Sequence, residues 1–139
     1  MPIIWRDDMN VGVEIIDHQH KYLVCLINII EAGVNCHLEK SLFVEQLSQL
    51  EAYTHFHFDQ EEKFQVQNKF PHYESNKNEH KQLIQKLGEI FGDLNSGGNV
   101  TLRQKDIGNL FEILKGWLLD HILVEDMKMK DFLADRHKE

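Results

Sequence analysis

Residues 73–94, YESNKNEHKQLIQKLGEIFGDL, decide the fold. Their candidates for a buried face recur at steps of three and four, the spacing that lines one side of an α-helix. These residues are Tyr73, Asn76, His80, Leu83, Leu87, Ile90 and Leu94. The face is aliphatic along most of its length, but it carries an asparagine and a histidine near its start. The stretch therefore predicts an amphipathic helix whose buried side becomes polar at one end.

Three further segments repeat this spacing. The first contains His20, Leu23, Ile27, Ile30 and Val34. The second contains Phe43, Leu47, Leu50, Thr54, His57, Glu61 and Phe64. The fourth in chain order contains Ile107, Leu110, Leu114, Trp117 and His121. Because each segment has one apolar face, all four are predicted to pack around a shared core.

The connectors between these segments are short and rich in turn formers, at 35–40, 68–71 and 95–99. Pro71 suits the first turn of a helix, and Thr101 with Gln104 forms a capping-box pattern before the fourth helix. Short connectors imply antiparallel neighbours. We therefore predict an all-α fold, an antiparallel up-down-up-down four-helix bundle.

The two ends of the chain do not belong to the four segments. Residues 1–17 show no sustained period and are predicted to form an N-terminal arm along the bundle, with Trp5 as its anchor. Residues 127–133 form a short amphipathic stretch, which predicts a short C-terminal helix. A length of 139 residues with 42% hydrophobic residues suits one domain that spans 1–139.

The net charge of −8 comes from 23 acidic and 15 basic residues, with no basic stripe. Nucleic acid and anionic membranes are therefore not expected as partners, and the sequence indicates no particular protein partner. Residues 1–8 have neither a basic region nor an apolar run, so we expect no signal peptide. Cys25 and Cys36 are predicted to lie roughly 16 Å apart on one helix, beyond disulfide reach, which favours reduced thiols and the cytoplasm.

Polar residues interrupt the four apolar faces at one level. They are His20, His57, Glu61, Asn76, His80 and His121. Antiparallel helices bring the starts of the first and third segments beside the ends of the second and fourth, so these side chains should share one layer. A buried layer of imidazoles and a carboxylate is costly unless a partner satisfies it, and a metal ion does so directly.

The spacing within each helix supports a metal site. His57 and Glu61 are four residues apart and can reach one centre, and Asn76 and His80 have the same spacing. Asp126 follows His121 by five residues, so we predict that the fourth helix breaks there and turns Asp126 inward. Imidazole and carboxylate ligands without thiolate suit iron or manganese, and two shared carboxylates suit two metals.

Four stretches of the sequence resemble the hemerythrin family, specifically the bacterial single-domain hemerythrins, and the resemblance covers nearly the whole chain. They are Val11-Gly12 with Asp17-His18-Gln19-His20-Lys21, His57-Phe58-Asp59-Gln60-Glu61-Glu62, Pro71 through His80, and Trp117-Leu118-Leu119-Asp120-His121-Ile122 with Asp126.

The resemblance implies a di-iron centre in the bundle core. It implies that His20 and His57 hold one iron, that His80 and His121 hold the other, and that Glu61 and Asp126 bridge the two. It also implies dioxygen, or another small diatomic ligand, as the binding partner, at the two-histidine iron.

One position departs from the family pattern. The third motif of the family is His-x-x-x-His, whereas this chain has Asn76-Lys77-Asn78-Glu79-His80. The amide oxygen of Asn76 or a water molecule could replace the missing imidazole, and either is a harder donor that favours ferric iron. His72 lies one helical turn earlier, roughly 6 Å along the axis, and could substitute only if the helix start shifts.

Other polar residues near the motifs have less specific interpretations. His18 and His55 should face away from the metal, and Glu62 is interpreted as part of a solvated surface. Asp17 has two open roles, orienting His20 or capping the first helix. Trp117, Ile122 and Phe58 suit the core and also the walls of an oxygen pocket.

We expect a non-haem iron protein that binds dioxygen for storage, delivery or sensing, rather than an enzyme. The alternative is an iron protein with an altered site that acts as a redox or nitric oxide sensor, or as an oxidase or peroxidase-like enzyme. The replacement at Asn76 supports this alternative, because a harder donor at this position favours the ferric state.

Overall fold

The computed structural model describes residues 2–95 and 104–136, and this part of the chain is helical, with no strand. Its main helices are α1 (Glu14–Asn35), α2 (Lys40–Gln67), α3 (Tyr73–Asn95), α4 (Gln104–Asp120) and α5 (Met127–Arg136). The connector after Asn95, Thr101 of the predicted capping pair and the side chains of Leu94, Ile107 and Leu110 lie outside the described residues. No helix in the described ranges is long and apolar enough to cross a membrane.

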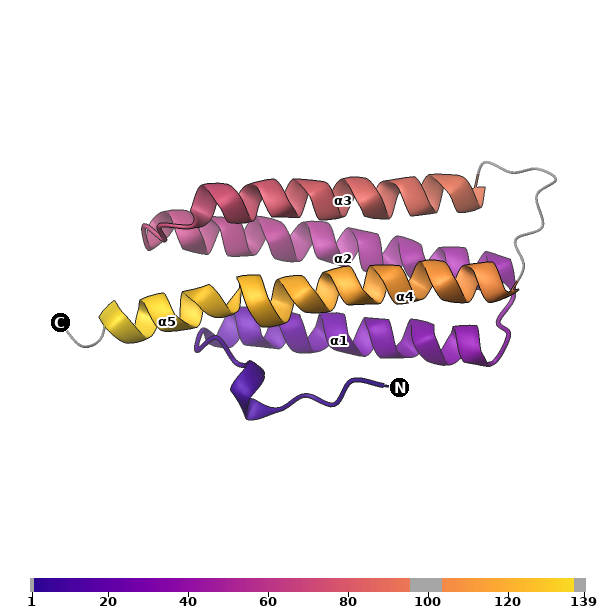
Figure 1. Cartoon of the computed structure of the whole chain (residues 1–139), viewed down its shortest axis with the longest axis horizontal. Helices are drawn as coiled ribbons and strands as arrows, with labels where there is room; N and C mark the ends of the chain where they lie inside the picture. The colour runs from indigo at the N-terminus through magenta and orange to yellow at the C-terminus, as the bar shows by residue number, and fades with distance from the viewer. Residues whose placement is uncertain (1, 96–103, 137–139) are drawn as a thin grey trace.

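The four long helices form the predicted antiparallel bundle (Figure 1). The helix α2 packs against α1 and α3, and α4 packs against the same two helices. The starts of α1 and α3 and the ends of α2 and α4 meet at one end of the bundle, from which α5 projects (Figure 1). The polar layer predicted from the sequence therefore falls at that end.

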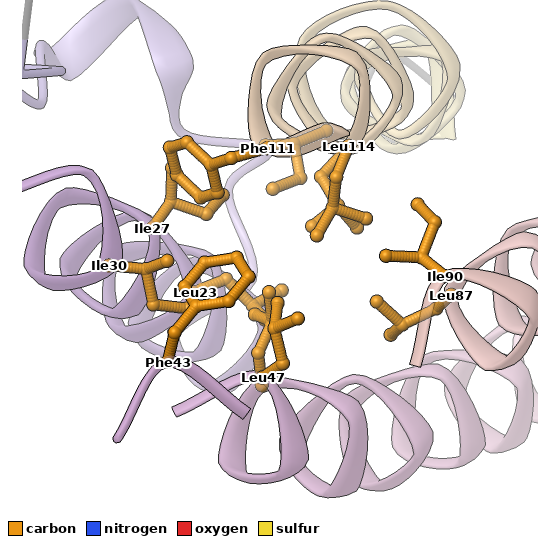
Figure 2. Packing of buried hydrophobic residues seen from close by; sticks show 12 residues of the cluster. Leu23, Ile27, Ile30, Phe43, Leu47, Leu87, Ile90, Phe111 and Leu114 are labelled. Carbon is orange, nitrogen blue, oxygen red and sulfur yellow. The ribbon is translucent and has the colours of Figure 1, made fainter. Parts of the chain in front are cut away.

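The apolar faces meet along the axis of the bundle, with side chains from all four helices pointing at one another (Figure 2). The buried cluster comprises Leu23, Ile27, Ile30, Phe43, Leu47, Leu50, Leu87, Ile90, Phe111, Leu114, Leu118 and Ile122. Burial of this apolar surface is the main force that holds the helices together. The apolar core ends where the polar layer begins, so closely packed helices hold the residues of the site in place.

The first two helices end in the same way. Lys69 after α2 and His37 after α1 have positive φ angles of 54° and 57°. After α2, the N–H of Phe70 donates to the carbonyl of Gln65 at 2.9 Å, the bond that defines a Schellman motif. This turn also buries Phe70 in a second cluster with Val11, Ile16 and Met129 at the α5 end.

The N-terminal arm runs beside α1 and includes the short turn η1 (Asp7–Met9) (Figure 1). Trp5 was expected to anchor it, but Met9 and Val11 are buried whereas Trp5 is half-buried. Asp17 takes neither of its two predicted roles. Its carboxylate accepts hydrogen bonds from the N–H groups of Val11 and Gly12, at 2.7 and 3.2 Å, and so holds the arm against the start of α1.

The interruption predicted after His121 is present and turns Asp126 inward, but it is a π-helical turn rather than a break in the helix. The chain continues from α4 through a π-helical turn, η2 (His121–Glu125), into α5. The N–H of Asp126 donates to the carbonyl of His121 at 2.9 Å, an i to i+5 bond that accommodates one extra residue in the turn. The widened turn buries Asp126 on the same side as His121, which is the outcome that the predicted break was expected to produce. The helix α5 contains the predicted C-terminal helix and extends it to Arg136.

Candidate metal centre

The structure brings all six candidate ligands together at the α5 end of the bundle. His20 comes from α1, His57 and Glu61 from α2, His80 from α3, His121 and Asp126 from the π-helical turn and its end, and none is more than 2% exposed. Their donor atoms form two groups that could each hold a metal ion, His20, His57, Glu61 and Asp126, and Glu61, His80, His121 and Asp126. Glu61 and Asp126 belong to both groups.

The two carboxylates divide their oxygens between the two histidine pairs. Oε2 of Glu61 lies 3.3 Å from Nε2 of His20 and 3.1 Å from Nε2 of His57, and Oδ2 of Asp126 lies 2.9 Å from Nε2 of His20. On the other side, Oε1 of Glu61 lies 3.1 Å from Nε2 of His80, and Oδ1 of Asp126 lies 3.1 Å from Nε2 of His121. Each carboxylate thus offers one oxygen to each pair.

Three of the four imidazoles have their outer nitrogen held by an acceptor. Nδ1 of His57 lies 2.7 Å from Oε1 of Gln19, Nδ1 of His80 lies 3.1 Å from Oε2 of Glu62, and Nδ1 of His121 lies 3.0 Å from Oε1 of Glu79. Ionised carboxylates only accept hydrogen bonds, so His80 and His121 donate through Nδ1–H. When these two imidazoles are neutral, the proton is therefore on Nδ1 and the lone pair of Nε2 points to the centre. This is the tautomer that binds a metal through Nε2.

Sequence analysis missed these three acceptors, and it assigned Glu62 to the solvated surface. The three acceptors share one feature of the sequence, because each is the immediate neighbour of a predicted ligand. Gln19 precedes His20, Glu62 follows Glu61 and Glu79 precedes His80 in the sequence, yet each contacts the histidine of the next helix. A sequence neighbour is rotated about 100° around a helix, which turns it from the core toward the adjacent helix.

The residues fit a bound cation. Nε2 of His80 and Nε2 of His121 are 2.9 Å apart, and two lone pairs at this distance repel unless a proton or a metal ion lies between them. Buried polar atoms at the centre also lack a hydrogen bond of good geometry, namely Nε2 of His57 and both carboxylate oxygens of Asp126. Buried polar atoms are rarely left without a partner, so these atoms indicate a ligand set.

Asn76 occupies the same layer and is 3% exposed. Its Nδ2 lies 3.4 Å from Oε1 of Glu61, the oxygen that faces His80, and its Oδ1 has no hydrogen-bond partner. His72 is exposed and its ring contacts Phe70 edge-on, so in this structure it does not replace the missing imidazole. His18 and His55 are exposed and face away from the centre, as predicted.

The ring of Phe58 packs directly against the ligand layer. It stacks on His80 with centroids 3.8 Å apart, and it meets His121 edge-on at 5.2 Å. Ile122 is buried in the apolar cluster of the bundle, whereas Trp117 is only partly buried. Phe58 thus forms part of the wall of the site, and Ile122 belongs to the packed interior.

The metal-free cluster has a characteristic pattern of pKa shifts. Burial alone would lower the pKa of His20, but the carboxylates of Asp126 and Glu61 outweigh it and raise this pKa to about 9. The same opposition, with Asp126 the main carboxylate, raises the pKa of His121 well above its usual range. Burial prevails at His57, whose pKa is lowered. Burial would raise the pKa of Glu61, but the imidazoles, His57 first, hold it well below its usual value.

These shifts predict that metal binding releases protons. At pH 7 to 8 His20 is protonated, because this range lies below its raised pKa of about 9, whereas a ligand imidazole must be neutral. The raised pKa of His121 acts in the same direction. The apparent affinity should therefore increase about tenfold or more per pH unit up to about pH 9. Calorimetric titration with Co²⁺ in buffers of different ionisation enthalpy measures the release, and heats that do not depend on the buffer would contradict the prediction.

The fold and the site together define a class, four-helix-bundle proteins that hold metal between histidines and carboxylates of facing helices. Comparison with known proteins gives the family. Residues 11–133 match the hemerythrin family, described as the hemerythrin HHE cation binding domain. This match covers most of the chain, and the chain belongs to the hemerythrin family.

Similar proteins carry the name bacteriohemerythrin. The protein from Pseudomonas paraeruginosa is 29% identical over 136 residues, which cover 97% of this chain and 82% of the relative. The proteins from Stenotrophomonas maltophilia and Clostridium acetobutylicum are each 24% identical and cover 93% and 92% of this chain, and 80% and 98% of their own lengths. Family membership and the cluster of imidazoles and carboxylates together support a non-haem iron protein.

Proposed function

We propose that this chain is a di-iron protein that binds dioxygen, or a similar small ligand, for storage, delivery or sensing. The division of the Glu61 and Asp126 oxygens between two histidine pairs carries the proposal. His20 and His57 would hold one iron, His80 and His121 would hold the other, and Glu61 and Asp126 would offer an oxygen to each. Ferrous iron, when bound, supplies the electrons and the open coordination that oxygen binding needs.

The protein contributes orientation and exclusion of water. Gln19, Glu62 and Glu79 fix the rings of three histidines through their Nδ1 atoms, so the Nε2 atoms are already aimed at the centre. The ring of Phe58 covers His80 and contacts His121. A dry wall reduces the access of water and protons to the site, and this favours reversible binding over oxidation of the metal.

A single experiment tests the proposal. The iron content of the anaerobically reduced chain should be about two per chain, as in other di-iron bundles. Exposure to oxygen should produce a charge-transfer band in the visible spectrum, and the band should disappear when oxygen is removed. An iron content near zero would contradict the metal site itself, whereas immediate and lasting conversion to a ferric spectrum would contradict reversible binding.

Asn76 supports a second candidate function. Asn76 occupies a ligand position of the family but carries an amide, whereas the six predicted ligands carry an imidazole or a carboxylate. The amide adjoins Oε1 of Glu61. An oxygen donor there favours ferric iron, so the site would serve as a redox or nitric oxide sensor, or as a catalyst that reduces peroxide or oxygen with an external reductant. Sustained turnover of peroxide in the presence of a reductant would support this function in place of oxygen storage.

A further inference from the structure

The two histidine pairs share the carboxylates of Glu61 and Asp126 but differ in the groups that their outer Nδ1 atoms contact. Behind His80 and His121 stand the carboxylates of Glu62 and Glu79, at 3.1 and 3.0 Å from Nδ1. Behind His57 stands the neutral amide of Gln19, at 2.7 Å, and Nδ1 of His20 has no partner. Within the described part of the chain, the Nδ1 atoms of one histidine pair thus contact two carboxylates and those of the other pair contact none.

Both of these carboxylates also reach solvent. The side chain of Glu62 is 22% exposed and that of Glu79 is 28% exposed, whereas the histidines that they contact are at most 3% exposed. Glu62 lines a groove of about 380 Å³ between α2 and α3, and Glu79 lines a groove of about 510 Å³ between α3 and α4. Each glutamate therefore has one side in water and one side on a buried imidazole.

A carboxylate that accepts a hydrogen bond from the Nδ1–H group makes an imidazole a stronger electron donor at Nε2. We infer that Glu62 and Glu79 are positioning residues that make the His80/His121 pair the tighter and more electron-rich metal position. Their contribution to metal affinity offsets the imidazole that is missing at Asn76, which lies on the same side, although both features favour ferric iron. The inference rests on the proposed di-iron function and assigns different strengths to its two positions.

The stronger position should bind metal first. Titration of the metal-free chain with Co²⁺ should show a tight step and a weak step. A His57→Gln variant, which loses a donor of the other pair, should keep the tight step and lose the weak one. If the tight step is lost instead, the order of the two positions is reversed and the inference is wrong.

Substitution of the two glutamates tests their role directly. Glu62→Gln and Glu79→Gln keep the shape of the side chain but remove its charge, and each should weaken the tight step by about ten- to a hundredfold. The weak step should stay unchanged. Glu74→Gln is the matched control, because it removes the same charge from an exposed position of α3 and should alter neither step.

The reverse substitution should give a gain. Gln19→Glu supplies His57 with the carboxylate that the other pair already has, so the weak step should become tighter by a similar factor. The reduction potential of the iron-loaded chain gives an independent measure. It should rise in Glu62→Gln and Glu79→Gln and fall in Gln19→Glu, because negative charge stabilises ferric iron.

The outcomes separate the inference from the proposed function. If wild type binds two cobalt ions but the glutamine variants match it in both affinity and potential, the di-iron function stands and the inference is overturned. If wild type binds no cobalt, both are overturned. Rescue of the tight step by Glu79→Asp, relative to Glu79→Gln, would support a role for charge rather than for side-chain packing.

Discussion

Replacement of Asn76 by histidine should strengthen the His80/His121 position and slow the oxidation of the iron centre. The side chain is 3% exposed and its amide adjoins Oε1 of Glu61, so an imidazole there would enter the same ligand layer. A softer nitrogen donor in place of an oxygen donor stabilises ferrous iron. The tight metal step should become stronger by on the order of tenfold or more, and conversion to the ferric spectrum in air should slow by a similar factor.

The control for this variant is Asn78→His, which makes the same substitution at an exposed position two residues further along α3. It should leave metal affinity and the rate of oxidation unchanged. If Asn76→His oxidises as fast as wild type while it binds two irons, the amide at this position does not limit the stability of the ferrous centre. The Asn76 argument for a redox or sensor function would then fail as well.

Glu61→Gln should abolish metal binding at both positions. Glu61 is fully buried, and its two oxygens lie between 3.1 and 3.8 Å from the Nε2 atoms of all four histidines. Glutamine keeps the shape but loses the negative charge, and its NH₂ group can face only one pair at a time. Both metal steps should weaken by at least about a hundredfold, the upper range for substitutions around metal sites.

Iron content per chain, measured after dialysis, checks this prediction, and circular dichroism confirms that the bundle remains folded. The comparison is His57→Gln, which removes a donor from one pair only and should retain about one iron per chain. Equal iron contents in the two variants would show that Glu61 does not serve both positions.

The helices and five of the six central residues could be predicted because their signals are periodic, whereas Asp126 was predicted from its resemblance to the family motif. Apolar residues at steps of three and four fix which side of a helix is buried, and interruptions such as His57 and His80 then identify the polar layer. Antiparallel packing determines the level at which these residues meet. These predictions need only one helix at a time and the order of the helices along the chain.

The contacts between helices were harder to predict. Glu62 belongs to a charged stretch that looks solvated, and only the position of α3 brings its carboxylate to His80. The five-residue step from His121 to Asp126 indicated a departure from a straight α-helix, but Ile122-Leu123-Val124-Glu125 contains no Gly or Pro to show its form. In the structure, one i to i+5 hydrogen bond, rather than a break in the helix, places Asp126 on the same side as His121.

The widened turn also determines how the end of the bundle is sealed. One residue accommodated in η2 rotates everything that follows by about 100° relative to an uninterrupted α-helix. In the observed register Met129 enters the apolar cluster with Val11, Ile16 and Phe70, and its sulfur accepts a hydrogen bond from Gln65 at 3.4 Å. An uninterrupted helix would present the ammonium group of Lys128 at that place. The irregularity that positions a ligand therefore also provides the apolar lid at this end, so the lid and the ligand set share a single backbone register.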